Sequence, residues 1–151
     1  MNWLCKKFDE LTLHQLYSIL QLRSIVFAIE QNCVYPDLDD KDQLSYHLMG
    51  WENNKLIAYT RLVPPDISYQ DIPSIGRVVT APSVRRNGIG KELMKLSIDK
   101  TQQLFGNTPI KISAQLYLKK FYESLGFIQT GDKYLEDGLD HIAMIRKSDL
   151  S

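Results

Sequence analysis

The sequence predicts a mixed α/β domain in which helices pack against one sheet. Three observations predict it. The length of 151 residues suits a single domain covering 1–151. An apolar content of 44% is enough for a sizeable core. The hydrophobic patterns change along the chain from strands to a helix, a strand, a second helix and two closing strands, an order typical of layers built around one sheet.

The first half begins with an expected strand at 2–8. Thr12 and Gln15 form a capping box that opens a helix, and helical spacing of apolar residues carries this helix to about residue 29. Two alternating apolar runs on either side of an Asn-Asn pair then predict a hairpin over 47–62.

The second half combines one long helix with shorter elements. The elements expected here are, in order, a strand at 74–80, a long helix between Gly88 and Gly106, a strand at 110–114, a short helix at 116–125 and strands at 127–131 and 142–146. Asp137-Gly138 is a turn signal between the last two strands. The acidic stretch 35–42 contains Pro36 and is expected to be a loop or a broken helix.

Charge and cysteine content limit the classes of function. Eighteen basic and eighteen acidic residues give a formal net charge of zero, which argues against a nucleic-acid partner held by bulk charge. Cys5 and Cys33 are too few for a disulfide framework and are expected to be free thiols. The sequence lacks a signal-peptide pattern and a membrane-spanning run, so we expect a cytoplasmic protein without a membrane partner. We expect no metal.

The most informative segment is the glycine-rich, basic turn within 78–91. A β-branched strand leads into the turn, and a helix follows it. The start of a helix presents unpaired N–H groups and partial positive charge, which together bind phosphate. Arg85, Arg86 and Lys91 add positive charge next to Gly88, where the backbone can approach a phosphate closely.

Two familiar phosphate motifs do not fit this turn. A Walker loop requires glycine in place of Arg85 and a hydroxyl residue in place of Glu92. A dinucleotide fingerprint requires a third glycine in place of Leu93. The pattern that remains is Arg-x-x-Gly-x-Gly at Arg85, Gly88 and Gly90. Considered alone, it also fits an ordinary strand-to-helix turn with a basic surface.

A second motif, Phe-Tyr-x-x-x-Gly-Phe, lies at 121–127. In this order and at this distance, the two motifs resemble those of the GNAT (GCN5-related N-acetyltransferase) superfamily. There the first motif binds the pyrophosphate of coenzyme A and the second flanks the acyl-CoA thioester. A core helix packed through Phe121 and Leu125 is the alternative explanation for the second motif alone.

The resemblance extends over nearly the whole chain and is greatest to the ElaA-like branch of the superfamily. It implies a mostly antiparallel, twisted central sheet flanked by helices. The further residues that carry it are Arg23, Phe27, Glu30, Gln31, Tyr35, Asp37, Asp39, Gly50, Trp51, Ile75, Gly76, Arg77, Val78, Glu136, Asp137, Gly138 and His141.

The resemblance implies that acetyl-CoA is a co-substrate. The edge of the strand at 78–80 would pair with the pantetheine arm as an added strand does, and main-chain amides of the turn would hold the pyrophosphate. Gln115 stands where the family usually has an asparagine-like contact to the cofactor. The expected cofactor-binding residues are Val78, Val79, Thr80, Arg85, Arg86, Asn87, Gly88, Ile89, Gly90, Lys91 and Gln115.

Tyr122 occupies the position of the family's usual general acid. A phenol, with a reference pKa of about 10, stays protonated at neutral pH and can donate to a departing thiolate. The alternative is an aromatic residue packed in the core. The general base stays open, because the strand before the turn has no carboxylate; a water chain, Glu30 or His141 are the candidates.

Acceptor recognition is expected from Arg23, Phe27, Glu30, Arg77 and His141. Their mixed charges suit a zwitterionic or carboxylate-bearing amine, although the charged members also fit a structural ion-pair group. The leading function is transfer of an acetyl group from acetyl-CoA to a primary amine of a small molecule or protein. The alternatives are an acyl-homoserine-lactone-synthase-like acyltransferase and a non-catalytic CoA-sensing module. A homodimer suits an enzyme of this size.

Overall fold

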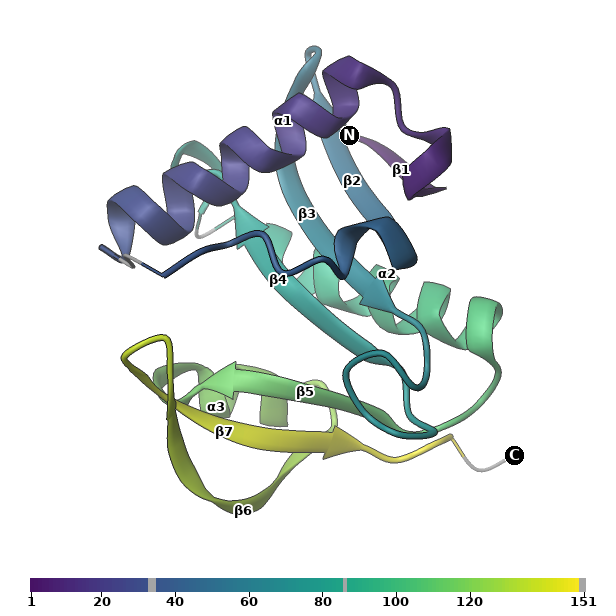
Figure 1. Ribbon diagram of the computed structural model, residues 1–151, viewed down its shortest axis with the longest axis vertical. Helices are drawn as coiled ribbons and strands as arrows, with labels where there is room; N and C mark the ends of the chain where they lie inside the picture. Colours follow the sequence, from purple (N-terminus) through teal and green to yellow (C-terminus); the bar gives the residue numbers. More distant parts are fainter. Residues whose placement is uncertain (33–34, 86, 150–151) are drawn as a thin grey trace.

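A computed structural model of the chain describes residues 1–32, 35–85 and 87–149. These residues form one seven-stranded sheet with the strand order β1-β2-β3-β4-β5-β7-β6 (Figure 1). Neighbouring strands are antiparallel except β4 and β5, which are parallel. The mostly antiparallel mixed sheet predicted from the sequence is therefore confirmed. The strands are β1 (Asn2–Lys7), β2 (Tyr46–Glu52), β3 (Lys55–Val63), β4 (Ser74–Thr80), β5 (Ile110–Gln115), β6 (Phe127–Glu136) and β7 (Leu139–Arg146).

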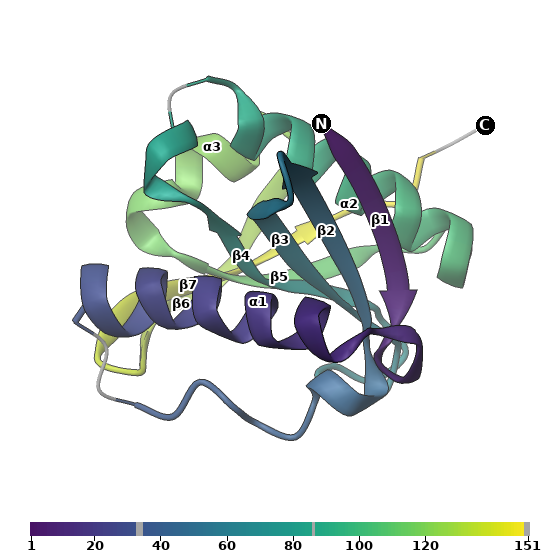
Figure 2. The same ribbon diagram turned by 90° about the horizontal axis from the view of Figure 1, so that it is seen from above.

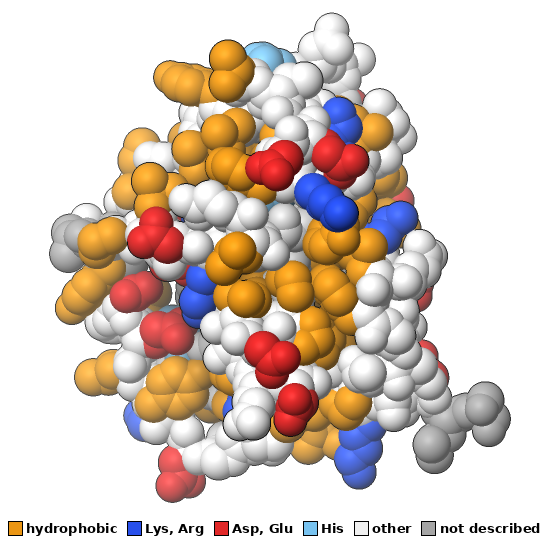
Figure 3. Space-filling view, turned by 45° about the vertical axis from the view of Figure 1, so that its right-hand side comes forward, with side chains coloured by type: hydrophobic (Ala, Val, Ile, Leu, Met, Phe, Trp, Pro, Cys, Tyr) orange, Lys and Arg blue, Asp and Glu red, His pale blue; other side chains and the backbone are white. Residues whose placement is uncertain are grey.

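Helices cover both faces of the sheet. Helix α1 (Leu13–Arg23) lies against one face, while α2 (Ile89–Phe105) and the short α3 (Lys119–Glu123) lie against the other (Figure 2). No helix in the described residues is both long enough and apolar enough to cross a membrane. On the face shown in Figure 3, hydrophobic, acidic and basic side chains lie interspersed.

Helix α1 begins at the predicted capping box. The Thr12 hydroxyl accepts a hydrogen bond from the Gln15 N–H at 3.1 Å, and the Gln15 side chain accepts one from the Thr12 N–H at 2.9 Å. Beyond α1 the helix widens into a π-helical segment, Ser24–Glu30, which ends with the Gln31 N–H donating to the Val26 carbonyl at 3.1 Å. Such segments are frequent at functional sites. This one borders the cavity described below.

The apolar side chains form two main cores, one on each face of the sheet. Met94 and Ile98 of α2 and Leu125 beyond α3 pack against alternate residues of β5 and β7, including Ile112 and Ile142. On the other face, the core contains Ile19, Leu22, Val26, Met49, Leu56, Ile57, Tyr59, Val79 and Ala81. Because side chains alternate along a strand, the intervening residues of β5 and β7 face away from α2.

The last two strands are longer than predicted. The expected strands at 127–131 and 142–146 are in fact β6 to Glu136 and β7 from Leu139. A register shift between Thr130 and Tyr134 interrupts the alternation that identifies a strand, and most side chains beyond it are exposed. The expected helix at 116–125 is a 3₁₀ turn, Leu116–Leu118, followed by α3.

Strands β4 and β5 separate after a single pair of residues. Ser74 pairs with Lys111, and no later residue of β4 pairs with β5 in the part of the chain that the structure describes. Strand β4 meanwhile stays paired with β3 as far as Thr80. The sheet is thus split at its centre, and the two halves diverge toward the end of β4 (Figure 1).

A β-bulge lies in β4 next to the split. The β3–β4 register shifts between Tyr59 and Arg61, and Arg77 opposite them has a left-handed φ of 49°. This conformation is unfavourable for a residue with a Cβ atom, so its surroundings must hold it in place. Bulges redirect side chains, and here the Arg77 guanidinium meets Asp37, with a distance of 2.7 Å from Nε to the carboxylate.

Candidate active site

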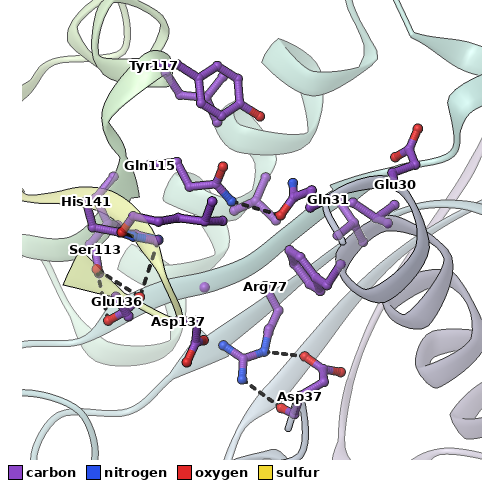
Figure 4. Close-up of a pocket in the computed structure, with 18 of the residues that line it drawn as sticks. Glu30, Gln31, Asp37, Arg77, Ser113, Gln115, Tyr117, Glu136, Asp137 and His141 are labelled. Atoms are coloured by element: carbon purple, nitrogen blue, oxygen red, sulfur yellow. Dashed lines mark hydrogen bonds and ion pairs between the residues drawn. The ribbon is translucent and has the colours of Figure 1, made fainter. Parts of the chain in front are cut away.

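The split between β4 and β5 opens into a cavity of about 600 Å³. Its walls come from the π-helical segment, β4, the start of α2, β5, α3 and the β6–β7 turn. Figure 4 shows Arg77 and Asp37 on one side of the cavity, with Ser113, Glu136 and His141 on the other. The volume lies within the range of small-molecule and cofactor sites.

One wall of the cavity is the unpaired edge of β4. Val78, Val79 and Thr80, which are expected to bind the pantetheine arm, line it. Among the described residues, no strand pairs with the side of β4 that points away from β3 at this end. The Thr80 carbonyl accepts a hydrogen bond from Arg85 Nη2 at 3.0 Å. An extended ligand can therefore bind to this edge as an added strand.

The N-terminus of α2 lies at the end of that edge. Gly88 is the residue before the helix, with a left-handed φ of 75°, and the first helical hydrogen bond runs from the Glu92 N–H to its carbonyl. The N–H groups at 89–91 precede that bond and are free for a ligand. Gly90 lines the cavity, and a Cβ atom added there would meet only Phe121 Cζ, at 3.9 Å.

Packing within the protein therefore does not require glycine at 90, whereas close approach of a ligand to the backbone does. The strand edge and the helix start together fit an extended chain ending in a diphosphate, as in coenzyme A.

Arg85, predicted to bind the pyrophosphate, forms a bidentate ion pair with Glu30. Both Nη–Oε distances are 2.6 Å, and the two side chains are 39% and 31% exposed. The hydrogen bonds from Arg85 hold the pKa of Glu30 below its usual value. The pair is accessible to solvent, so a phosphate can compete with Glu30 for the guanidinium. Arg86 lies outside the described residues.

Tyr122, the predicted general acid, lines the cavity from α3 and is 5% exposed. Its ring packs edge-on against Phe121 and Phe127. Burial raises the pKa of Tyr122 well above its ordinary value, so its hydroxyl carries a proton at neutral pH. Tyr122 therefore both packs in the core and borders the cavity.

Beside the cavity lies a group of charges whose inner members Arg23, Arg61 and Asp42 are buried and whose outer members are half-buried. It is here called the arginine–aspartate network and consists of Arg23, Arg61, Arg77, Asp37, Asp39 and Asp42. Arg23 is fully buried, and its guanidinium contacts Asp37 and Asp42 at 2.8 Å each. Asp42 also accepts a hydrogen bond from Arg61 Nη1 at 3.0 Å. Burial is the largest single influence and opposes ionisation of Asp42, but the hydrogen bonds and charges of Arg23 and Arg61 together outweigh it and keep the pKa of Asp42 below its usual value.

The structure brings most of the sequence-predicted site residues together. Phe27, Glu30, Arg77 and His141 line the cavity, as do Arg85, Gly90 and Gln115. Arg23 does not; it is enclosed in the arginine–aspartate network, so the expected substrate contact is replaced by a structural ion pair. Asn87, Gly88, Ile89 and Lys91 lie at the start of α2 but do not line the cavity.

Sequence reasoning missed several polar residues of the far wall. Ser113 on β5 and Glu136 and Asp137 at the β6–β7 turn all line the cavity. For Ser113 the sequence did carry a signal. Apolar and polar residues alternate along β5, so Ser113 lies on the same face of the strand as Gln115. Gln115 donates a hydrogen bond to Gln31 across the cavity at 3.1 Å, which connects β5 to the end of the π-helical segment (Figure 4).

The fold, the split sheet and the glycine-containing helix start are those of an acyl-CoA N-acyltransferase. Residues 21–148 match the family described as an acetyltransferase (GNAT) domain, and the chain belongs to this family. Protein ElaA of Escherichia coli is 37% identical over 149 residues, 97% of each chain. The resemblance to the ElaA-like branch seen in the sequence is thereby confirmed.

Solved structures agree. The crystal structure of E. coli ElaA superposes with a TM-score of 0.90, covering 97% of this chain and 99% of that one. An acyl-CoA N-acyltransferase from Pseudomonas aeruginosa is 39% identical and superposes with a TM-score of 0.91 over the same shares of the two chains. The CoA-dependent acyl-homoserine lactone synthase BjaI shares the fold. It is 16% identical and superposes with a TM-score of 0.71, covering 96% of this chain and 82% of that one.

Proposed function

We propose that this protein is an acetyl-CoA-dependent N-acetyltransferase that acts on a primary amine of a small molecule. The observation that carries the proposal is the meeting of three features around one cavity: the unpaired edge of β4, the start of α2 at Gly90 and the protonated phenol of Tyr122. Each fits a different part of an acyl-CoA.

The strand edge and helix start position the thioester. Main-chain groups at 78–80 bind the pantetheine amides, and the N–H groups at 89–91 with Arg85 bind the diphosphate. These contacts fix the thioester beside Tyr122, which turns a bimolecular encounter between thioester and amine into a positioned one. Once the amine attacks, the Tyr122 hydroxyl donates its proton to the departing thiolate.

The acceptor enters from the side of the β6–β7 turn. Arg77 is already neutralised by Asp37 at 2.7 Å, and Arg85 is assigned to the diphosphate, so neither guanidinium is available for an acceptor carboxylate. The far wall instead offers the carboxylates of Glu136 and Asp137. A positively charged amine fits this wall better than the zwitterionic acceptor expected from the sequence.

A thiol-release assay tests the proposal. Acetyl-CoA is incubated with wild-type protein and a panel of spermidine, amino acids, an aminoglycoside and a peptide with a free N-terminus, and free CoA is measured. We expect turnover with at least one amine and formation of its acetyl amide by mass spectrometry. CoA binding without turnover on any member of the panel would instead support a sensing module.

Tyr122→Phe separates catalysis from binding in this assay. It removes only the hydroxyl, and the ring can keep its contacts with Phe121 and Phe127. We expect kcat to fall about 100-fold, the usual size of a general-acid contribution, with the CoA dissociation constant unchanged in calorimetry. Tyr17→Phe is the control, because that side chain is 70% exposed and does not line the cavity. A Tyr122→Phe rate equal to wild type would exclude the acid role.

A further inference from the structure

His141 is held in one orientation on the far wall of the cavity. It lies on β7, is 7% exposed and pairs across the sheet with Gln115 of β5 and Tyr134 of β6. Its ring stacks against the Tyr134 ring with 6.3 Å between centroids. A buried imidazole facing a cavity proposed for amine acetylation raises the question of which ring nitrogen carries the proton.

The backbone answers that question. His141 Nδ1 lies 2.9 Å from the Leu139 carbonyl oxygen. A carbonyl oxygen can only accept a hydrogen bond, so Nδ1 carries the hydrogen in the neutral ring, and Nε2 is left with its lone pair. His47, in contrast, is enclosed by Tyr59 and the Asp42 carbonyl, at 2.7 and 2.9 Å, and has no place in the cavity.

A carboxylate lies beside Nε2 of His141. Glu136 Oε2 lies 3.4 Å from His141 Nε2, and the Ser113 hydroxyl holds the same carboxylate at 3.2 and 3.3 Å from its two oxygens. Ser113 is itself 2.5 Å from the Tyr134 hydroxyl. When a proton reaches Nε2, the adjacent negative charge stabilises the resulting imidazolium. Figure 4 shows His141, Glu136 and Ser113 together on this wall.

The other side chain that the sequence suggests as a base is unsuited to accept a proton. Glu30 is held in a bidentate pair by Arg85, and these hydrogen bonds lower its pKa. Asp37 on the opposite wall is bound to Arg23 and Arg77 at 2.8 and 2.7 Å. The lowered pKa of Glu30 weakens it as a base, and both Asp37 carboxylate oxygens are already occupied by arginines.

We propose that His141, through Nε2, is the general base that deprotonates the acceptor amine, and that Glu136 is the positioning residue that stabilises its protonated form. This inference rests on the proposed acetyltransferase function. The catalytic role is new relative to the sequence-based expectation, which left the base open among three candidates.

The proton balance is simple. An acceptor ammonium gives one proton to Nε2, and the freed nitrogen lone pair forms the C–N bond as the C–S bond breaks. Tyr122 protonates the departing thiolate. The second proton of the attacking nitrogen returns to the Tyr122 oxygen, and the imidazolium releases its proton to solvent, so each turnover releases one proton.

A pH profile of His141→Gln tests the role of the base. Glutamine removes the titrating group but keeps a polar side chain. We expect kcat to fall about 100-fold, the acid limb of the wild-type kcat/KM profile to disappear, and CoA affinity to stay unchanged. The exposed His14→Gln is the matched control and should keep the wild-type profile. A His141→Gln variant with the wild-type rate and acid limb would overturn the assignment.

Glu136→Gln distinguishes a positioning role from a purely structural one. The amide can still accept from Ser113, but it no longer favours the protonated imidazole. The acid limb should therefore shift to lower pH while His141→Gln abolishes it. Tyr134 stacks on the His141 ring, and the other titratable or charged residues that line the same cavity are Glu30, Tyr35, Asp37, Arg77, Arg85, Tyr117, Tyr122 and Asp137. An unshifted limb in folded Glu136→Gln would remove Glu136 from the proposal.

A third measurement does not depend on the acceptor. Two-bond ¹⁵N–¹H correlation spectra of ¹⁵N-histidine protein, assigned with His141→Gln, report which ring nitrogen is protonated. We expect the Nδ1–H form of neutral His141; the Nε2–H form would overturn the inference even if acetyl transfer is demonstrated. Wild-type protein that shows the Nδ1–H form but releases no thiol from acetyl-CoA with any amine would count against the proposed function instead.

Discussion

Two groups of charges border the cavity, and they differ in burial. The arginine–aspartate network encloses Arg23 completely and leaves Arg61 only 4% exposed. The Arg85–Glu30 pair at the start of α2 has each side chain about one third exposed. Inside the protein a missing partner leaves an uncompensated charge, whereas near solvent water replaces the partner. The network therefore fixes a wall of the cavity, while the exposed pair can open for a ligand.

The largest expected effect comes from removing one carboxylate of the network. Asp42→Asn keeps the shape of the side chain but leaves Arg23 and Arg61 with less negative charge. We expect the free energy of unfolding to fall by about 3–5 kcal/mol in urea titrations. The exposed Asp40→Asn is the control and should change it by less than about 0.5 kcal/mol. Equal stabilities of the two variants would mean that the buried Asp42 contributes no more to stability than an exposed aspartate does.

Acid should weaken the same network. Burial opposes ionisation of Asp39 and Asp42, yet hydrogen bonds from Arg61 and Arg23 keep the pKa of each carboxyl below its usual value. The unfolded chain therefore takes up protons first. This stability is fully present above the ordinary aspartate pKa of about 3.9 and is lost as the pH falls through the lower folded values.

Urea unfolding of wild type and Asp42→Asn, followed from pH 7 to 3, measures this loss. The variant should show the shallower decline below about pH 4. Parallel curves for the two proteins would show that Asp42 does not contribute to it.

Gly90→Ala should affect binding without harming the fold. The added methyl group makes an ordinary 3.9 Å contact with Phe121, and alanine favours a helix more than glycine. The same methyl group obstructs a phosphate that approaches the main chain. We expect CoA affinity to fall about tenfold in calorimetry and thermal stability to stay or rise. Lys95→Ala, on the exposed face of α2, should leave CoA affinity unchanged; an equal loss in both would disprove the phosphate site.

The smallest effect is expected from the exposed ion pair. Glu30→Gln releases Arg85 from its carboxylate and should strengthen CoA binding a few-fold, with little change in stability, because exposed pairs contribute about 0–1 kcal/mol. The gain should decrease when calorimetry is repeated at high salt. Weaker CoA binding by Glu30→Gln would show instead that the pair holds Arg85 in its binding position.

The sequence indicated the proposed CoA-binding end of the cavity better than its other walls. Arg85, Gly88 and Gly90 were recognisable because a phosphate-binding turn needs glycines at fixed spacing before a helix, and Tyr122 followed from its motif. The strands and long helix were also predictable, because each has its own periodicity. These signals are local in the chain.

The other walls of the cavity depend on contacts between distant segments. Asp37, Asp39 and Asp42 looked like an acidic loop, and only the fold shows that they neutralise three arginines from α1, β3 and β4. Of the charged residues suggested as an ion-pair group, Arg23 and Arg77 join this network, while Glu30 pairs separately with Arg85. Glu136 was hidden because the bulge in β6 breaks the alternation that would have placed it beside His141.

The single Ser74–Lys111 pair has a consequence for the motions of the free protein. Its two half-sheets share one ladder rung, so amide protons on the open side of β4 should exchange with deuterium readily. A bound pantetheine would supply the missing rungs and slow that exchange. At a hundred times its dissociation constant, the ligand would add about 2.7 kcal/mol to global stability. Acyl-CoA would then serve as a structural strand that completes the sheet as well as a donor.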